Sequence, residues 1–289
     1  IITPEVCFIF QNGNDKDLHI YNMSTVSTLL QPIDYEEESE DGKTMSYPFF
    51  KKWLMDPNQR IYRKYDFIPF NMTPPDTDVF NMFLGMNSNI YGKPSDNPDK
   101  MLKPYFDLVR ELCGGSDYDA QYLHNFFANI FQEPTKRPPV SIIIKGKQGT
   151  GKNMILDAIG NMIDKEHYIT TSDPDDLFGT HAEGFYRKLL VNLNESEGKK
   201  TFQFEGNIKS FITEPTITVN PKFVRPSTVS NHARLIITTN KETPISIGVK
   251  SKDRRYVAYK TTDLYKKYNH IFGQSYITIL ENLNSWRHF

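Results

Sequence analysis

The residues with the clearest chemical potential form a glycine- and lysine-rich stretch at 146–153. Its glycines allow the backbone to turn so tightly that successive N–H groups converge on one small volume. Lys152 adds an ammonium group that can lie along a row of phosphate oxygens. The spacing matches the Walker A pattern, except that Asn153 stands where Ser or Thr normally supplies a metal-binding hydroxyl. The stretch therefore predicts a phosphate-binding loop, or P-loop.

This loop has the sequence context that phosphate binding needs. Residues 140–145 are apolar and β-branched, and residues 154–163 repeat apolar side chains at helical spacing. A strand, a glycine turn and a helix N-terminus together make an anion site. The positions that we expect to contact nucleotide are Gly146, Gln148, Gly149, Thr150, Gly151, Lys152 and Asn153. The alternative is a glycine-rich turn without a ligand.

A second group of candidate catalytic and metal-binding residues lies at the end of the apolar run 188–195. A buried strand that ends in an acid is the Walker B arrangement, in which one position holds the Mg²⁺ shell and the next polarises the attacking water. Glu195 is the candidate catalytic base, and Glu197 is a nearby helper. Asn194 stands where Asp is usual, so the candidate Mg²⁺ positions are Asn153, Asn194 and Glu195. The alternative is an ordinary strand end.

A third strand and a pair of arginines complete this set of motifs. The strand, 233–240, ends in a polar amide, Asn240. Because the carboxyl ends of parallel strands line one crevice, Asn240 can act as a sensor of the γ-phosphate or the attacking water. Arg254 and Arg255 follow, and either can serve as an arginine finger, a group that accelerates phosphoryl transfer by about 10³- to 10⁵-fold. The alternative for this pair is a salt-bridged surface.

The segment between the second and third motifs carries the candidate nucleic-acid contacts. Residues 202–214 have a helical pattern, and 216–228 have the pattern of a hairpin whose turn is stiffened by prolines. Since phosphates are common to all DNA sequences, Lys209, Lys222 and Arg225 predict sequence-independent binding. The basic residues that gather after the P-loop are Lys199, Lys200, Lys209, Lys222, Arg225, Arg234 and Lys241. A solvated basic turn is the alternative.

Composition limits the class of protein. The chain has 289 residues, 38% apolar content and a net charge of −1, which fits one or two globular domains and excludes a uniformly basic nucleic-acid binder. Cys7 and Cys113 are too few and too far apart to predict disulfides or a zinc site. No apolar run reaches the ~20 residues of a membrane span. We expect an intracellular protein without a membrane partner, and the first residue, Ile1, suggests a fragment of a longer chain.

The pattern of apolar residues divides the chain into four segments. Residues 1–45 are expected to be a partly extended N-terminal segment with an acidic loop, and 46–133 a small helical domain with aromatic stripes. Residues 134–262 contain all the motifs above, and 263–289 are expected to form a C-terminal helical segment. The predicted fold class is α/β, with a mainly parallel sheet in the P-loop core and a small helical domain before it.

Taken together, GKQGTGKN, VNLNE, IITTN, DRRYV and the basic hairpin resemble the superfamily 3 helicases of DNA viruses and phages. The helicase part of poxvirus-type, giant-virus and phage primase-helicases is the nearest likeness, over about residues 140–262. The resemblance implies an AAA+-like ATPase that uses ATP and Mg²⁺, assembles as a hexameric ring with sites between subunits, and moves on single-stranded DNA. It also implies a primase domain or replication proteins as partners, at the viral or phage replication site in the host cell.

Three functional hypotheses follow. The leading one is an ATP-driven DNA helicase or translocase domain of a replication protein. A small-molecule P-loop kinase is the second, and it would use lid arginines and an acceptor pocket without needing a basic hairpin. A degenerate ATP-binding scaffold for assembly is the third, suggested by the amides at Asn153 and Asn194. Stimulation of ATP hydrolysis by single-stranded DNA separates the first from the second, and binding without turnover identifies the third.

Overall fold

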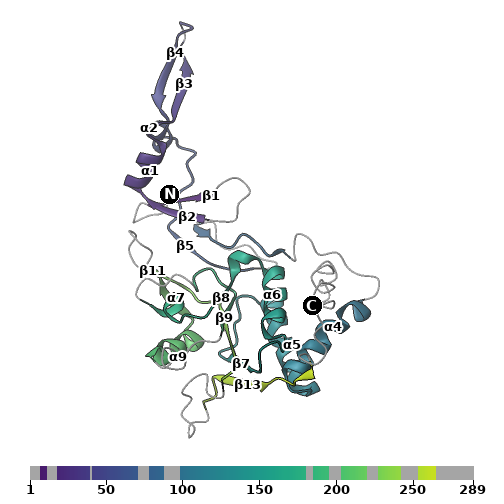
Figure 1. Cartoon of the computed structure of the whole chain (residues 1–289). Helices are drawn as coiled ribbons and strands as arrows, with labels where there is room; N and C mark the ends of the chain where they lie inside the picture. Colours follow the sequence, from purple (N-terminus) through teal and green to yellow (C-terminus); the bar gives the residue numbers. More distant parts are fainter. Residues whose placement is uncertain are drawn as a thin grey trace. The chain divides into compact units, whose positions relative to one another are not determined.

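The chain forms two compact units in the computed structural model (Figure 1). The structure describes residues 7–11, 18–39, 41–70, 78–87, 98–179, 185–194, 203–219, 227–241 and 253–264. Of these, the residues up to 66 and residues 78–82 belong to the first unit, and the others belong to the second. Each unit has its own secondary structure and is described separately.

The second unit is built on a five-stranded sheet. Its strands are β7 (Ser141–Lys145), β8 (Tyr168–Thr171), β9 (Leu190–Asn194), β12 (Arg234–Thr239) and β13 (Tyr256–Lys260). They lie in the order β13-β7-β12-β9-β8, and every neighbouring pair is parallel. The central strands are almost wholly buried, which is typical of parallel strands covered on both faces. The predicted α/β class with a parallel sheet is confirmed.

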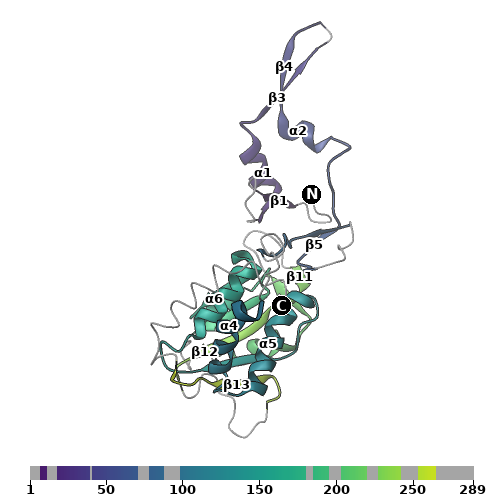
Figure 2. The ribbon, with the colours of Figure 1, turned by 90° about the vertical axis from the view of Figure 1, so that its right-hand side faces the viewer.

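Helices flank these strands (Figures 1 and 2). α6 (Lys152–Ile163) starts directly after the P-loop, and its buried side chains recur at helical spacing. The other helices of the unit are α4 (Pro98–Leu112), α5 (Asp117–Gln132), the 3-10 helix η1 (Lys165–His167), α7 (Asp175–Phe178) and α9 (Glu205–Thr213). α4 contacts both α5 and α6. Within the described ranges, no helix has the length and apolar character needed to cross a membrane.

A separate two-stranded hairpin follows α9 in the sequence. β10 (Thr216–Val219) pairs antiparallel with β11 (Ser227–Ser230), so the strands of the predicted hairpin are confirmed. Its turn, which carries Lys222 and Arg225, lies outside the described residues. The expected C-terminal helical segment also lies outside them from residue 265 onward.

The first unit consists of small paired elements. β1 (Cys7–Gln11) pairs antiparallel with β2 (Leu18–Asn22), and β3 (Asp34–Glu38) pairs antiparallel with β4 (Thr44–Pro48). β5 (Lys64–Asp66) and β6 (Val79–Asn81) form a short parallel pair. Two helices, α1 (Met23–Leu30) and α2 (Phe49–Leu54), complete the unit.

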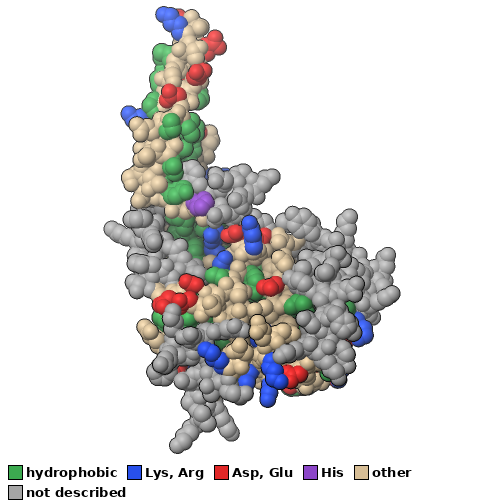
Figure 3. All heavy atoms as spheres, in the orientation of Figure 1, with side chains coloured by type: hydrophobic (Ala, Val, Ile, Leu, Met, Phe, Trp, Pro, Cys, Tyr) green, Lys and Arg blue, Asp and Glu red, His purple; other side chains and the backbone are tan. Residues whose placement is uncertain are grey.

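Four acidic residues, Asp34, Glu36, Glu37 and Glu38, lie in strand β3, within the segment where the sequence predicted an acidic loop. Every residue of β3 and β4 is exposed, and acidic side chains lie along this hairpin (Figure 3). Cross-strand contacts explain the pairing, because Tyr35 stands opposite Tyr47. Lys52 of α2 lies 2.7 Å from the carboxylate of Glu37, and its ammonium is 4.1 Å from the ring centre of Tyr35. The remaining negative charges are tolerated since they point into water.

Arg234, the first residue of β12, is completely buried and joins α5 to the sheet. Its guanidinium donates to Oδ1 of Asn129 at 2.7 Å, and to the carbonyl oxygens of His232, Pro134 and Glu133 at 2.8, 3.1 and 3.1 Å. Burial lowers the pKa of Arg234 to about 9. In the sequence this residue is one of the basic side chains that follow the P-loop, and its burial removes it from any basic surface there. Neutral oxygens satisfy its donors, so it is a structural residue inside the unit.

The division into units differs from the segment boundaries expected from the sequence. The sequence placed α4 and α5 in a helical domain of residues 46–133, whereas both belong to the unit that contains the sheet. The bonds from Arg234 to Asn129 and to the residues just after α5 give the physical reason. A helix tied to a strand by a buried cation is part of the same core.

Replacing Arg234 with Met should strongly destabilise the second unit. The substitution keeps most of the side-chain volume but leaves buried carbonyls unpaired, at about 1–3 kcal/mol for each unsatisfied group. We expect the free energy of unfolding to fall by about 3 kcal/mol or more, measured by urea denaturation. The control is Lys136→Met, which removes an exposed surface pair with Glu133 and should change it by less than about 1 kcal/mol. Equal stability of the two variants would contradict the anchoring role.

Candidate functional site

The P-loop joins β7 to α6, and its glycines determine its shape. Gly149 and Gly151 both have φ angles of 83°, a region that strains any residue with a Cβ atom. At Gly146, an added Cβ would stand 2.0 Å from Oγ1 of Thr261. The N–H of Gly146 donates to the carbonyl of Thr239 at 2.9 Å, which ties the loop to the end of β12. The P-loop therefore lies at the carboxyl edge of the parallel sheet.

Lys152 is the first residue of α6, and it is only 6% exposed. Its ammonium folds back over the loop and donates to the carbonyl oxygens of Gly146 and Lys147 at 2.8 and 2.9 Å. The buried hydroxyl of Thr150 donates to the same carbonyl of Lys147 at 2.9 Å. Because an anionic phosphate is a stronger acceptor than a carbonyl, the ammonium can turn to a phosphate without leaving the loop.

Residues that follow β13 support the P-loop, and sequence reasoning did not single them out. Thr261 donates its N–H to the carbonyl of Lys145 at 2.8 Å, and its side chain packs against Gly146. Asp263 Oδ2 lies 2.6 Å from Nζ of Lys147, in an exposed pair that contributes little free energy. A short polar run after a strand has no distinctive sequence signal, which explains why these contacts were not predicted.

Three asparagines converge on one hydroxyl at this edge of the sheet. The hydroxyl belongs to Thr238 of β12, which is completely buried. Its Oγ1 lies 2.9 Å from Oδ1 of Asn194, 3.0 Å from Oδ1 of Asn192 and 3.3 Å from Oδ1 of Asn153. The parallel register places Thr238 opposite Asn194, and α6 supplies Asn153. The two predicted metal positions, Asn153 and Asn194, therefore lie beside the same atom.

We call Thr238 and the asparagines Asn153, Asn192 and Asn194 the amide cluster. Two of its members, Asn192 and Thr238, were not predicted from the sequence. Asn192 and Asn194 are two residues apart in β9, so both side chains point to the same face of the sheet. A polar residue repeated at period two in an apolar strand is the signal that could have identified Asn192. Thr238 carries no comparable signal, because threonine is common in strands.

The oxygen atoms of the cluster suit a hard cation such as Mg²⁺. This ion prefers oxygen ligands and usually combines a few protein groups with water and substrate phosphates. The cluster offers neutral amide and hydroxyl oxygens, and the described part of the chain contains no group of three His, Cys, Asp or Glu side chains that could hold a metal. Glu195, the predicted base and third metal position, lies outside the described residues. The described members of the cluster therefore offer only neutral oxygens to a cation.

Asn240 follows β12 directly and is exposed. The carbonyl of the preceding residue, Thr239, accepts a hydrogen bond from the N–H of Gly146 at 2.9 Å. The hydroxyl of Thr239 accepts one from the N–H of Lys241 at 3.0 Å. Asn240 therefore stands at the edge of the sheet that carries the P-loop. Its role as a sensor of the γ-phosphate stays a prediction.

Arg254 and Arg255 lie at the opposite end of the sheet. The N–H of Ser141, the first residue of β7, donates to the carbonyl of Arg255 at 2.7 Å. Since β7 runs from Ser141 to Lys145 at about 3.3 Å per residue, roughly 13 Å of strand separates the arginines from the loop. Arg254 is exposed, and Arg255 donates to the carboxylate of Asp253 at 3.1 Å. The structure does not bring these arginines to the P-loop of their own chain.

Lys209, the third predicted DNA contact, lies on α9 and has acidic neighbours. Its ammonium pairs with the carboxylate of Glu205, one turn earlier, and stands 4.0 Å from that of Asp253. Asp253 also accepts from Arg255. Lys209 is thus a member of a local charge network, and its contact with DNA stays a prediction.

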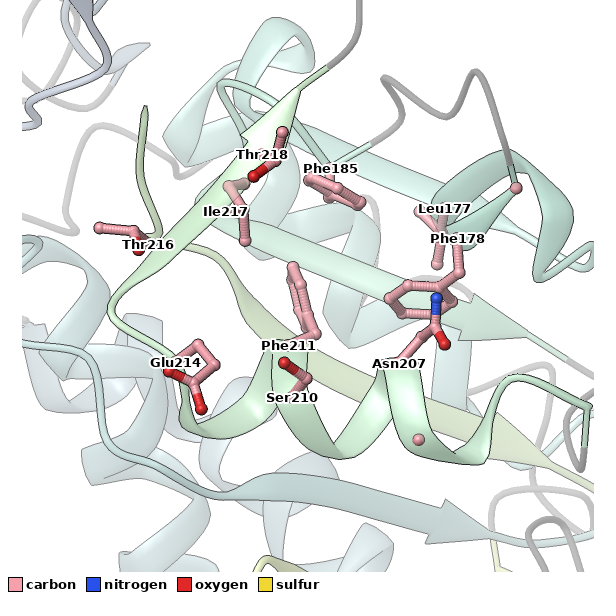
Figure 4. A pocket seen from close by; sticks show the side chains of 12 residues that line it. Leu177, Phe178, Phe185, Asn207, Ser210, Phe211, Glu214, Thr216, Ile217 and Thr218 are labelled. Carbon is pink, nitrogen blue, oxygen red and sulfur yellow. The ribbon is translucent and has the colours of Figure 1, made fainter. Parts of the chain in front are cut away.

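A cavity of about 520 Å³ lies between α7, α9 and β10 (Figure 4). The ring of Phe211 stands 5.7 Å from that of Phe178 and 5.5 Å from that of Phe185, measured between centres, and these rings form one wall. The rest of the lining is mixed, with the apolar Leu177 and Ile217 beside polar side chains such as Asn207 and Glu214. No residue of the P-loop borders this cavity, so it is distinct from the phosphate site.

The P-loop and the paired arginines lie within a region that known proteins share. A family of unknown function (DUF5906) matches residues 144–255. Over 193 residues, the sequence is 30% identical to the DNA primase-polymerase of Nitratiruptor phage NrS-1. The chain is similar to part of a phage primase-polymerase. The aligned part covers 63% of this chain and 26% of the relative, so the chain spans about a quarter of the length of the phage protein.

Solved structures of the NrS-1 protein share the fold. One apo structure of its C-terminal region has a TM-score of 0.70 at 21% identity, and the similarity covers 99% of this chain and 63% of that one. A second apo structure gives a TM-score of 0.68 at 22% identity, with 95% and 61% covered. The similarity to these structures therefore extends over nearly the whole chain, beyond the region matched by the family.

Removal of the Lys152 ammonium should weaken nucleotide binding with little effect on folding. Hydrogen bonds to charged groups contribute about 1.5–3 kcal/mol, so Lys152→Ala should lower affinity for a fluorescent ATP analogue by about 10- to 100-fold. The control is Lys147→Ala, since that ammonium points to Asp263 and its loss should matter far less. Circular dichroism verifies the fold of both variants. Unchanged affinity after Lys152→Ala would show that the P-loop assignment is wrong.

Proposed function

We propose that this chain is an ATP-driven translocase, or helicase, domain of a viral or phage DNA-replication protein. The observation that carries the proposal is the placement of a glycine-shaped loop, with the nearly buried Lys152, beside the amide cluster at the carboxyl edge of a parallel sheet. This edge is where α/β proteins bind their ligands. Similarity to a phage DNA primase-polymerase supports the replication context. The domain would act inside the infected cell.

In this proposal the chain's residues divide the work of ATP hydrolysis. The backbone N–H groups of the P-loop and the Lys152 ammonium bind the triphosphate. Asn153, Asn194 and Glu195 would hold Mg²⁺, and the ion would supply positive charge to neutralise the phosphates. Glu195 accepts a proton from the attacking water, and Asn240 orients that water or the γ-phosphate.

The position of the paired arginines favours action between subunits. Arg254 and Arg255 lie at the far end of β13 from their own P-loop, as the bond from Ser141 to Arg255 requires. An exposed arginine at that end can contact nucleotide held by a neighbouring copy of the chain. A closed ring, proposed here to be a hexamer, provides such a neighbour for every subunit.

Single-stranded DNA should stimulate ATP hydrolysis, and the basic hairpin should mediate the effect. The variant Lys222→Ala/Arg225→Ala should bind DNA more weakly, with a salt slope reduced by about 0.7 for each lost phosphate contact. Its basal ATP hydrolysis should persist. The measurements are ATPase rates with and without oligonucleotide and DNA affinity across a series of salt concentrations.

The control for this experiment is Lys241→Ala, which removes another exposed cation outside the hairpin turn. If DNA affinity and salt slope are unchanged in the double variant, the hairpin is not the DNA contact. Nucleotide binding with no hydrolysis in excess Mg²⁺, by the unmodified chain with or without DNA, would instead identify the assembly scaffold. The neutral amide cluster is the observation that keeps this second candidate function open.

Mixed rings should reveal whether the arginine acts between subunits. Lys152→Ala and Arg254→Ala chains should each be inactive, and mixtures should recover part of the activity because some interfaces then combine an intact P-loop with an intact arginine. The measurement is the ATPase rate as a function of the mixing ratio, with assembly followed by light scattering. Absence of recovery in assembled mixtures would assign the finger to another residue or to the same chain.

A further inference from the structure

The hydroxyl of Thr238 is surrounded by more amide oxygens than it can donate hydrogen bonds to. Three oxygens, from Asn153, Asn192 and Asn194, lie within 3.3 Å of its Oγ1. A hydroxyl carries one proton and two lone pairs, so it can donate to only one of them. The other two contacts bring an amide oxygen against the oxygen of a buried hydroxyl, which is unfavourable.

A chain of hydrogen bonds determines which oxygen receives the proton. Beyond Thr238, Nδ2 of Asn192 donates to Oγ1 of Thr170 at 3.4 Å, and Thr170 donates to the hydroxyl of Tyr168 at 2.6 Å. Tyr168 donates to Oδ1 of Asp157 on α6 at 3.1 Å. Every donor in this series points the same way, toward a carboxylate. Because Nδ2 of Asn192 donates to Thr170, the atom of Asn192 that faces Thr238 is Oδ1. That oxygen can only accept, so the Thr238 proton is assigned to it, at 3.0 Å.

The far end of this chain is fixed by packing as well as by hydrogen bonds. An added Cβ at Gly160 of α6 would stand 2.2 Å from the Tyr168 ring, so the ring lies directly against the helix backbone. Burial raises the pKa of Tyr168 well above its ordinary value, which keeps the phenol protonated and therefore a donor. Asp157 Oδ1 serves as its acceptor. The order of the donors is therefore held from α6.

With its proton committed, Thr238 Oγ1 has two lone pairs available, and two amide groups remain beside it. We propose that Thr238 is a positioning residue that accepts hydrogen bonds from the amide nitrogens of Asn153 and Asn194 when Mg²⁺ and nucleotide are bound. A half-turn of each amide exchanges its oxygen for its nitrogen and directs the oxygen to the metal. This inference rests on the proposed nucleotide site and adds the residue that orients its amides.

The same geometry gives a reason for asparagine in place of aspartate at position 194. An ionised aspartate has only acceptor atoms, so it cannot donate to a hydroxyl whose proton is already used. An amide offers a donor on one side and an acceptor on the other, and thus satisfies Thr238 and the metal together. Thr238, Asn153 and Asn194 form a matched set in which one hydroxyl orients two metal ligands.

The test compares Thr238→Val, which removes the hydroxyl but keeps the shape, with Thr238→Ser, which keeps it. The probe is a fluorescent ADP analogue, titrated in Mg²⁺ and separately in EDTA. Loss of two neutral hydrogen bonds should lower affinity in Mg²⁺ by about thirtyfold in the Val variant, since each contributes about 1 kcal/mol. Affinity in EDTA should change by less than about twofold, because the P-loop is intact. The Ser variant should bind like the unmodified chain in both conditions.

An equal loss in Mg²⁺ and EDTA would overturn the proposal, because it would show damage to the P-loop and no effect on metal ligands. Unchanged affinity of the Val variant in Mg²⁺ would overturn it as well. Failure of the unmodified chain to bind the probe at all would contradict the proposed function itself. Should Thr238→Val not fold, Thr170→Val breaks the hydrogen-bond chain at an exposed residue. Its affinity should then fall about threefold in Mg²⁺ only, from partial loss of one hydrogen bond, and no change would count against the proposal.

Discussion

The parallel register of β7, β12 and β9 is the constraint on which the candidate site depends. Thr238 stands opposite Ile144 on one side and Asn194 on the other. Because side chains alternate between the faces of a sheet, a shift by one residue would turn Thr238 away from both asparagines. The apolar faces of the strands resist such a shift, and Arg234 fixes the start of β12 to the end of α5. A contact far from the P-loop thereby helps to maintain its geometry.

Asn194, an amide where aspartate is usual, would change how the proposed metal site works. A carboxylate at this position would attract a cation before any nucleotide arrives, whereas a neutral amide attracts it only weakly. Cation and nucleotide are then expected to bind together, with the phosphates supplying much of the negative charge beside the proposed ligand Glu195. Neutral groups also cost less to bury than charged ones, provided that their hydrogen bonds are satisfied. Asn192 lies in the middle of β9 and is completely buried, which shows that this part of the sheet accommodates a polar but uncharged side chain.

The sequence predicted the local parts of this structure and missed the long-range ones. The strand, glycine loop and helix around Lys152 are contiguous, so residue types and spacing were enough to identify them. The role of Thr238 depends on strand pairing across more than forty residues. The burial of Arg234 depends on acceptors near Asn129, about a hundred residues earlier. Nothing local distinguishes a buried arginine from an exposed one, and likewise the acidic β3 could not be recognised as a strand without its partner.

The exposed hairpin of β3 and β4 affects the tendency of this protein to aggregate through its strand edges. Among the described residues these strands pair only with each other, so each has an open edge that could accept a strand from a second molecule. The side chains of Asp34, Glu36 and Glu38 oppose that contact, because two such edges would bring like charges together. Salt reduces this repulsion beyond about 10 Å at 0.1 M ionic strength. The resistance of the protein to edge-to-edge aggregation should therefore decline as ionic strength rises.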